Sequence, residues 1–174
     1  MSHDQLLPIS DTLESGVLAL NNAHAIELSW LDADQLRVLI RGAFYARRIG
    51  EIEAVLLAFD EGMMYDSPNY RWFRARYRRF VYVDRVVVAE SARRRGYARQ
   101  LYVDLFEHAR RAGHDIVGCE VNHDPPNPAS DAFHAALRFT EVGRASIHQA
   151  GKTVRYLVRA LGSGPEALRV NPRK

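Results

Sequence analysis

The sequence predicts an α/β fold with a mixed central β-sheet flanked by helices, and three observations support this prediction. Runs of β-branched residues alternate along the chain with segments that have the apolar spacing of helices. A long apolar segment at 80–88 carries only one charged pair, which is typical of a central strand. A loop rich in arginine and glycine joins that segment to an amphipathic helix.

The first third of the chain predicts a strand, two helices and then two more strands. We expect a short strand at 16–20 and a helix that begins at Asn21-Asn22. Asp32 and Gln35 have the spacing of a capping box, so a second helix should follow them. Strands are expected at 44–49 and 52–59, on either side of a turn at Gly50.

Segment 63–79 is less regular and mixes aromatic residues with arginines. Ser67-Pro68-Asn69 is a turn signal within it. Aromatic and arginine side chains in alternation could stack on nucleic-acid bases, although such a segment is more often half core and half solvated face. We interpret the segment as a loop that crosses a ligand cleft, and nucleic-acid binding through residues 70–79 is an alternative.

The stretch 86–112 organises the chain as a strand, a basic glycine loop and a helix. Apolar residues recur at helical spacing from Ala98 to Ala112. The first turn of a helix leaves N–H groups without partners and carries partial positive charge. Gly96 permits a tight turn and a close ligand, since it has no Cβ. The loop therefore predicts a phosphate or pyrophosphate site, although the Walker and dinucleotide-binding motifs are both absent.

The last third of the chain predicts a strand, a short helix and a pair of strands. A strand is expected at 116–121, followed by a rigid loop at 122–128. Asn127 and Pro128 have the residue types of an N-cap and a first helical position. The strand pair is expected at 141–148 and 153–161. We therefore expect a single domain at 1–162 and a mobile C-terminal tail at 163–174.

Composition excludes several classes of protein. The net charge of +3 is too small to argue for nucleic acid, and all but two of the 24 basic residues are arginines. The single cysteine, Cys119, forbids an internal disulfide and fits a reducing compartment. We expect no signal peptide, no membrane segment and no metal site, and therefore a cytoplasmic protein.

Two motifs resemble those of the GNAT N-acetyltransferase superfamily. Arg93-x-x-Gly96-x-Ala98, with Val88 five residues earlier, resembles motif A of that family. The segment from Asn127 to Phe139 resembles the family pattern Asn-x-x-Ser/Ala-x-x-Phe-Tyr-x-x-Leu-Gly-Phe. The two motifs stand in the right order, and the order of the expected elements is also that of the family. The resemblance spans roughly residues 80–160 and implies a GNAT-type acyl-CoA N-acyltransferase fold.

The resemblance implies that acetyl-CoA is a co-substrate and that an amine acceptor attacks its thioester directly in a ternary complex. The acceptor would be a small-molecule amine or an amine of a peptide or protein, and a homodimer is left open. Amides at 93–99 would hold the pyrophosphate, Val86 and Val88 would pair with the pantetheine arm, and Asn122 and Asn127 would hold that arm. The residues expected to contact acetyl-CoA are Val86, Val87, Val88, Arg93, Arg94, Arg95, Gly96, Tyr97, Ala98, Arg99, Asn122, Asn127, Ser130 and Phe133.

The catalytic residues are expected on two elements. His134 stands where the family carries a tyrosine that is often invoked as the acid for the leaving thiolate, and Arg138 replaces the usual glycine. We expect Phe133 to point into the core and His134 to face the cleft. Asp84 is expected to be the general base, unless it forms a salt bridge with a neighbouring arginine.

Alternatives remain for the base and for the function. Tyr82 and Glu120 could serve as the base through water. A non-catalytic acyl-CoA-binding or regulatory module is the competing function, favoured if His134 replaces an acid that catalysis needs.

Overall fold

A computed structural model describes residues 5–147 and 151–162 of the chain. Seven strands form one mixed sheet in the order β1-β2-β3-β4-β5-β7-β6. The elements in chain order are β1 (Leu6–Pro8), η1 (Asp11–Leu13), α1 (Glu14–Ala23), α2 (Ala25–Leu28), α3 (Ala33–Gly42), β2 (Tyr45–Ile49), β3 (Ala54–Asp60), α4 (Pro68–Arg74), β4 (Val81–Val88), η2 (Glu90–Ala92), α5 (Tyr97–Arg111), β5 (Ile116–Asp124), α6 (Pro128–Ala136), β6 (Thr140–Ile147) and β7 (Lys152–Ala160).

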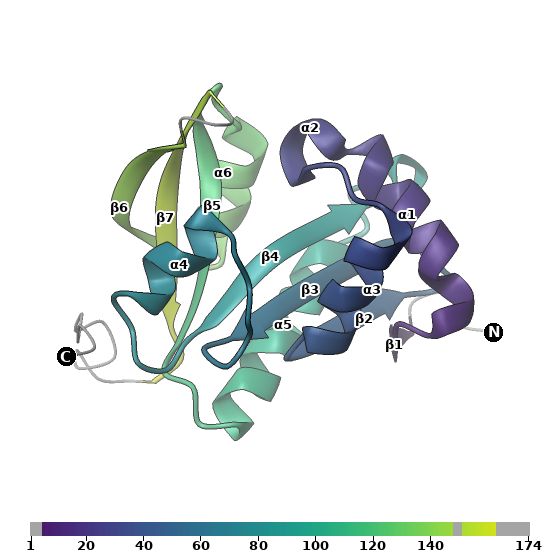
Figure 1. Cartoon of the computed structure of the whole chain (residues 1–174), viewed down its shortest axis with the longest axis horizontal. Helices are drawn as coiled ribbons and strands as arrows, with labels where there is room; N and C mark the ends of the chain where they lie inside the picture. Colours follow the sequence, from purple (N-terminus) through teal and green to yellow (C-terminus); the bar gives the residue numbers. More distant parts are fainter. Residues whose placement is uncertain (1–4, 148–150, 163–174) are drawn as a thin grey trace. The chain divides into compact units, whose positions relative to one another are not determined.

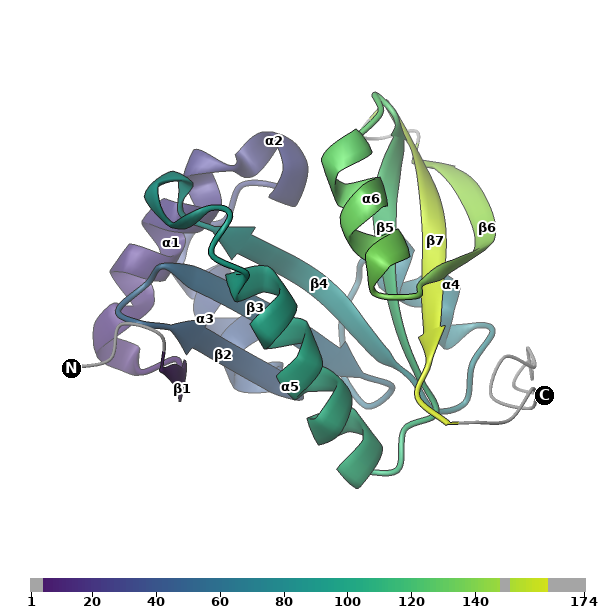
Figure 2. The same ribbon diagram turned by 180° about the vertical axis from the view of Figure 1, so that it is seen from behind.

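The chain divides into two compact units, and the first comprises Met1–Met63 and Val83–Glu107. Its strands β1, β2 and β3 pair in antiparallel fashion, with Tyr45 opposite Ala58. Helices α1 and α3 lie on one face of these strands and α5 lies on the other (Figures 1 and 2). The Tyr45 hydroxyl donates to Asp104 of α5 at 2.8 Å. Strand β3 is buried from Ala54 to Phe59, as expected for a strand covered on both faces.

The second unit comprises Met64–Tyr82 and His108–Lys174. The start of β4 pairs in parallel with β5 at Val81–Val117 and Tyr82–Gly118, and β5, β7 and β6 follow in antiparallel order. Helices α4 and α6 lie on opposite faces of these strands (Figures 1 and 2). Cys119 of β5 is buried.

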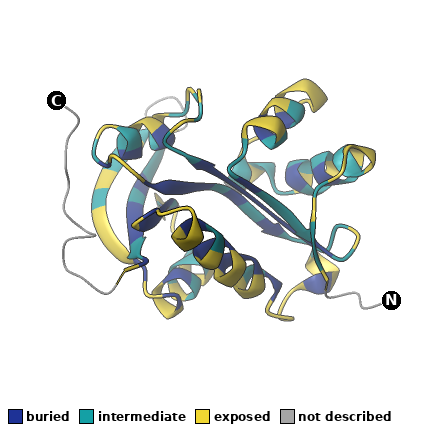
Figure 3. Cartoon of the chain, turned by 90° about the horizontal axis from the view of Figure 1, so that it is seen from below, coloured by how far each residue is buried: buried dark blue, intermediate teal, exposed yellow. Residues whose placement is uncertain are grey.

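Burial follows the layers of the fold. Figure 3 shows the strands mainly in the buried colour, while the helices turn exposed faces to solvent. The helix that begins after Asp32 is confirmed with its capping box, because Asp32 accepts from the Gln35 N–H at 2.7 Å and Gln35 accepts from the Asp32 N–H at 2.9 Å. No helix in the described part of the chain is long and apolar enough to cross a membrane.

Three expectations about the elements are wrong. The expected strand at 16–20 lies inside α1, where Val17 and Asn21 share a buried face at helical spacing, and the first strand is β1 instead. Asn21 and Asn22 therefore lie at the end of a helix and not at its start. Residues 122–124 continue β5 and are not part of a loop. The expected tail at 163–174 lies outside the described residues.

Segment 63–79 also differs from expectation, because it contains helix α4. Ser67 accepts from the Tyr70 N–H and Pro68 occupies the first helical position, so the turn signal is in fact a helix start. Tyr70, Phe73 and Tyr77 are buried. The segment is half core and half solvated face, and these three rings do not present faces to nucleic-acid bases.

Candidate active site

The basic glycine loop joins β4 to α5 in the first unit. Gly96 has φ +80°, and an added Cβ there would meet no atom within 4 Å. Arg94 is also left-handed, with φ +64°. Arg93, Arg95 and Arg99 are exposed around this turn. The loop therefore offers open backbone and forked positive side chains at the start of a fifteen-residue helix, which suits an anionic group.

The expected contact residues on β4 and at the start of α5 differ in how far they are buried. Val86 and Val88 are half-buried and Val87 is buried, as alternation along a strand requires. Tyr97 is buried and Ala98 is half-buried. Tyr97 consequently anchors the start of α5 in the core, while Val86 and Val88 share the more exposed face of β4.

Helix α6 of the second unit carries three of the expected site residues, Ser130, Phe133 and His134, and a fourth, Asn127, is its N-cap. The Asn127 side chain accepts from the Ser130 N–H at 3.1 Å, and Pro128 follows as the first helical residue, so the predicted N-cap is confirmed. Asn122 lies in β5, opposite Val154 of β7. The side-chain oxygen of Asn127 is thus engaged in capping the helix, whereas Asn122 belongs to the sheet.

His134 is buried, with 4% of its surface exposed. Its Nδ1 donates to the carbonyl oxygen of Ser130 at 2.8 Å, and the Ser130 hydroxyl lies 3.2 Å from the same nitrogen. Burial lowers the pKa of His134 below its usual value near 6.5, against the opposing effects of this hydrogen bond and of Asp131. The imidazolium is therefore less populated near pH 7 than in a solvated histidine.

The orientations of Phe133 and His134 are the reverse of those expected. Phe133 is half-buried, whereas His134 shares the buried face of α6 with Leu137, three residues on. The His134 ring meets the Phe133 and Phe139 rings edge to face, with centroids 5.2 Å apart in both pairs. The helix thus turns its histidine inward because the chain after it packs Leu137 and Phe139 into the core.

Arg138 has φ +61°, a left-handed backbone that glycine adopts at lower cost. The Arg138 N–H donates to the Ala135 carbonyl and the Phe139 N–H donates to the His134 carbonyl. These two bonds are those of a Schellman motif, with arginine at the position that usually carries glycine.

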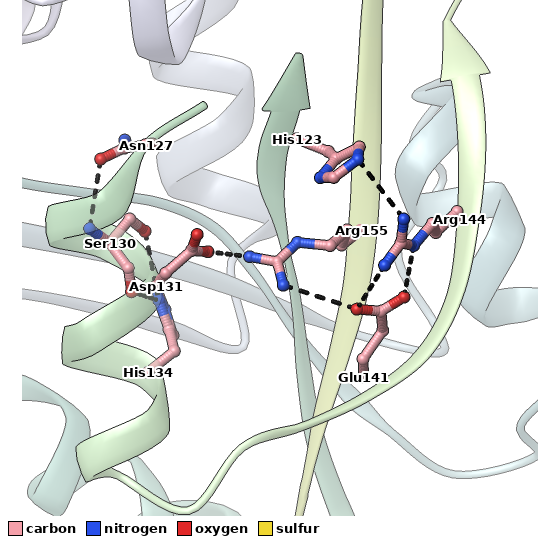
Figure 4. Close-up of polar contacts among 8 residues, drawn as sticks. All are labelled: His123, Asn127, Ser130, Asp131, His134, Glu141, Arg144 and Arg155. Carbon is pink, nitrogen blue, oxygen red and sulfur yellow. Dashed lines mark hydrogen bonds and ion pairs between the residues drawn. The ribbon is translucent and has the colours of Figure 1, made fainter. Parts of the chain in front are cut away.

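Ion pairs attach α6 to the sheet (Figure 4). Arg155 of β7 pairs with Asp131 of α6 and, at 3.5 Å, with Glu141 of β6. Arg144 pairs with Glu141 at 2.6 Å and lies 3.4 Å from the His123 ring nitrogen. The hydrogen bond from Arg144 holds the pKa of Glu141 below its usual value. This network fixes the helix that carries His134.

Asp84 forms the salt bridge that was the alternative to its role as a base. Its carboxylate accepts from Arg85 Nε at 2.6 Å, and the two side chains are only 5% and 6% exposed. Arg85 also donates to the Asn21 side chain at 2.8 Å. Asp84 is therefore the counter-ion of a buried arginine, and its role as a base stays a prediction.

The two other candidate bases lie in the second unit. Tyr82 is buried against the rings of Tyr70 and Phe73. Glu120 is half-buried, and its Oε1 accepts from the side-chain amide of Asn69 at 3.0 Å. No sequence pattern singles out Asn69, but the Ser67-Pro68 helix start could have placed it on α4.

The expected residues are thus distributed between the units. The first unit holds Asp84, Val86 to Val88 and the loop, and the second holds Asn122, Asn127, Ser130, Phe133 and His134. Among the residues that the structure describes, no cluster of histidine, cysteine or carboxylate side chains could hold a metal ion.

Comparisons with solved structures show the fold. The chain matches the ribosomal-protein-S18-alanine N-acetyltransferase of Escherichia coli with a TM-score of 0.68 and 13% identity, over 95% of this chain and 98% of that one. It matches yncA of Salmonella typhimurium, solved with acetyl-CoA, with a TM-score of 0.68 and 16% identity, over 94% and 97%. It matches NAA60 of Arabidopsis thaliana, in complex with acetyl-CoA, with a TM-score of 0.71 and 14% identity, over 90% and 97%.

Sequence comparison gives the family. No curated protein matches the sequence at the required significance. The model of the acetyltransferase (GNAT) family matches residues 29–139, which is more than half of the chain and includes both motifs. The protein therefore belongs to the GNAT acetyltransferase family.

Proposed function

We propose that this protein transfers the acetyl group of acetyl-CoA to an amine by direct attack in a ternary complex. The observation that carries the proposal is the loop at Gly96, where a left-handed backbone with open space beside it begins a long helix. Acetyl-CoA carries a pyrophosphate, which is the kind of group such a loop binds. Membership of the GNAT family and neighbours solved with acetyl-CoA support the same assignment.

The residues fit this ligand in distinct ways. The amides and arginines from Arg93 to Arg99 bind the pyrophosphate, and the backbone of Val86 and Val88 pairs with the peptide-like pantetheine arm. Asn122, Asn127, Ser130 and Phe133 supply further contacts to that arm. The partial exposure of Val86 and Val88 supports these roles, because residues that keep access to solvent can meet a ligand.

Acetyl-CoA supplies a thioester whose carbonyl carbon forms the new C–N bond while the C–S bond breaks. An N–H of Val86 or Val88 holds the oxyanion that develops. The base takes the proton that the amine loses, and the leaving sulfur takes a proton from an acid or from water. Glu120 acting through water is the base that we favour, since Asp84 is already the counter-ion of Arg85.

His134 is the proposed acid for the leaving sulfur. Because the neutral ring carries its proton on Nδ1, where it is hydrogen-bonded to the Ser130 carbonyl, His134 can supply a proton from its other nitrogen only as the imidazolium. Burial disfavours that form. This observation favours a second function, an acyl-CoA-binding module without transfer, which is distinguished by assaying CoA release with a panel of amines.

The proposed acceptor is an amine. One structural neighbour is named for the alanine of ribosomal protein S18, and another, the NatC complex, was solved with Gag peptide and CoA. We therefore propose a peptide or protein amine, or a small-molecule amine, and a cytoplasmic location that fits the lone reduced cysteine.

The cofactor site is tested with Gly96→Glu. Acetyl-CoA at a hundred times its Kd should stabilise the parent by about 3 kcal/mol, seen as a rise in Tm. The glutamate places bulk and negative charge against the pyrophosphate, so the variant should lose that rise.

Gly151→Glu is the matched control. Gly151 is also left-handed, with φ +59° and no atom within 4 Å of an added Cβ, but it lies in the turn before β7. It suffers the same backbone strain and gains the same charge, yet it should retain the ligand-induced rise in Tm. Equal rises in both variants would show that the loop does not bind acetyl-CoA.

A further inference from the structure

Three residues form a row across one face of the second unit's sheet. Glu120 of β5 lies opposite Tyr156 of β7, and Tyr156 lies opposite Gly143 of β6. Helix α4 covers this row, because Asn69 reaches Glu120 and Tyr156 while Trp72 contacts Tyr156. The segment that connects β3 to β4 thus places the side chains of Asn69 and Trp72 against the strands that carry Glu120 and Tyr156.

Two glycines make room for this helix. A Cβ on Gly118 would lie 2.3 Å from the Phe73 ring, and one on Gly143 would lie 2.5 Å from the Trp72 ring. The Trp72 ring stacks on Tyr156 with centroids 4.0 Å apart and an interplanar angle of 18°. These close contacts fix the position of α4 over β5 and β7 and therefore the position of Asn69.

The amide of Asn69 is held in one orientation. Its nitrogen donates to Glu120 Oε1 at 3.0 Å, because a carboxylate can only accept, and its oxygen accepts from the Tyr156 hydroxyl at 3.0 Å. Burial and the negative charge of Glu120 raise the pKa of Tyr156 to about 12. The hydroxyl therefore stays protonated near neutral pH and keeps donating.

We propose that Asn69 is a positioning residue, which fixes the Glu120 carboxylate as the acceptor of the proton that the amine substrate loses through water. The proposal rests on the proposed acetyl transfer and makes α4 part of the machinery that activates the acceptor. A hydrogen bond donated to a carboxylate favours its ionised form.

Ionisable side chains lie near Glu120 or act on its partner Tyr156. Tyr156 faces it from β7, and Arg76 on the α4 side acts on Tyr156 as a fixed positive charge. Burial and Glu120 together raise the pKa of the adjacent Cys119 thiol well above its usual value. The Tyr156 hydroxyl and the Cys119 thiol thus stay protonated across the acidic range of a pH–rate profile.

The test compares pH–rate profiles for the amine that gives the highest turnover with acetyl-CoA. Asn69→Ala should move the acidic limb of the kcat/KM profile to higher pH by about one unit, the equivalent of one hydrogen bond to a charged group. Asn69→Asp should move it further, because two carboxylates then face each other. The KM for acetyl-CoA should stay within about twofold of the parent in both.

Tyr156→Phe is the matched control. It removes only the hydrogen bond from Tyr156 to Asn69 and leaves the bond from Asn69 to Glu120, so the acidic limb should move much less. Glu120→Gln should remove the limb. A limb that stays in place in Asn69→Ala while turnover falls at every pH would reduce Asn69 to an anchor of α4 and overturn the proposal.

The ¹³C shift of the Glu120 carboxyl gives a readout that does not need turnover. Its titration midpoint should rise in Asn69→Ala, and an unchanged midpoint overturns the proposal. Failure of the proposed function has a different signature, in which acetyl-CoA raises the Tm but no amine in the panel releases CoA.

Discussion

The Phe139 N–H donates to the carbonyl oxygen of His134 at 3.0 Å, and the two rings meet edge to face with centroids 5.2 Å apart. The backbone bond and the ring contact are the two parts of a Schellman helix end. His134 is therefore a structural element of this helix end, whatever its role in the reaction. Arg138, which directly precedes Phe139 in the sequence, has the left-handed backbone that this helix end requires.

Arg138→Gly should stabilise the protein by about 1 kcal/mol, because glycine adopts the left-handed backbone without the steric cost that an L side chain incurs. Urea denaturation of the parent and the variant measures the difference. Arg138→Ala is the control, since it removes the charge and retains the strained backbone. Equal stabilisation by both variants would assign the effect to the charge.

His134 should make the protein less stable in mild acid. Its folded-state pKa lies below its unfolded value near 6.5, so the unfolded chain binds the proton more readily. The stability that buried neutral His134 provides is complete above pH 6.5 and is lost as the pH falls toward the folded-state pKa. His134→Phe should flatten this part of a plot of unfolding free energy against pH, and an unchanged slope would contradict the assignment.

The same variant tests the acid. If the imidazolium of His134 protonates the leaving sulfur, His134→Phe should lower turnover roughly 10²-fold at nearly unchanged CoA affinity. His134→Tyr should retain much of the activity, since the family carries a tyrosine there. If His134→Phe turns over at the rate of the parent, His134 is not the acid and its role is confined to the helix end.

Asp84→Asn should destabilise the protein by about 3 kcal/mol, because it removes the carboxylate that pairs with the buried guanidinium of Arg85 at 2.6 Å. The acidic limb of the pH–rate profile should persist in this variant if Asp84 is only a structural partner. Loss of the limb at unchanged stability would instead identify Asp84 as the base. Thermal unfolding and the pH–rate profile together distinguish the two roles.

Gly118→Ala should destabilise the second unit by about 2 kcal/mol, because the new methyl group would overlap the buried Phe73 ring. Phe73→Leu in the same chain should recover part of the loss by making room. Measured unfolding free energies of the two single variants and the double variant give the coupling. Additive losses would show that Phe73 does not pack on Gly118.

Sequence patterns predict the features whose partners lie close along the chain. The capping box of Asp32 and Gln35 spans three residues, and the Asn127-Pro128 helix start spans two. The family's glycine at the place of Arg138 is compatible with a left-handed backbone, and the structure shows that backbone with arginine in place. Such signals depend on local backbone chemistry, which the sequence carries directly.

Features that depend on distant partners are not predicted. Segment 16–20 has no clear periodicity over five residues, and only packing shows that Val17 belongs to a helix face. His134 turns inward because Phe139 packs on it, which a helical pattern alone cannot show. Asn69 and Glu120 are 51 positions apart, so their contact emerges only when α4 packs on β5.

The burial of Cys119 has a practical consequence for assays. It is the only cysteine of the chain, and burial raises its thiol pKa well above the usual value, so little reactive thiolate is present near neutral pH. A thiol reagent that counts released CoA should therefore see almost no background from the folded protein. In the absence of CoA, the rate at which the same reagent labels Cys119 measures how often β5 opens transiently to solvent, because the thiol is buried in that strand.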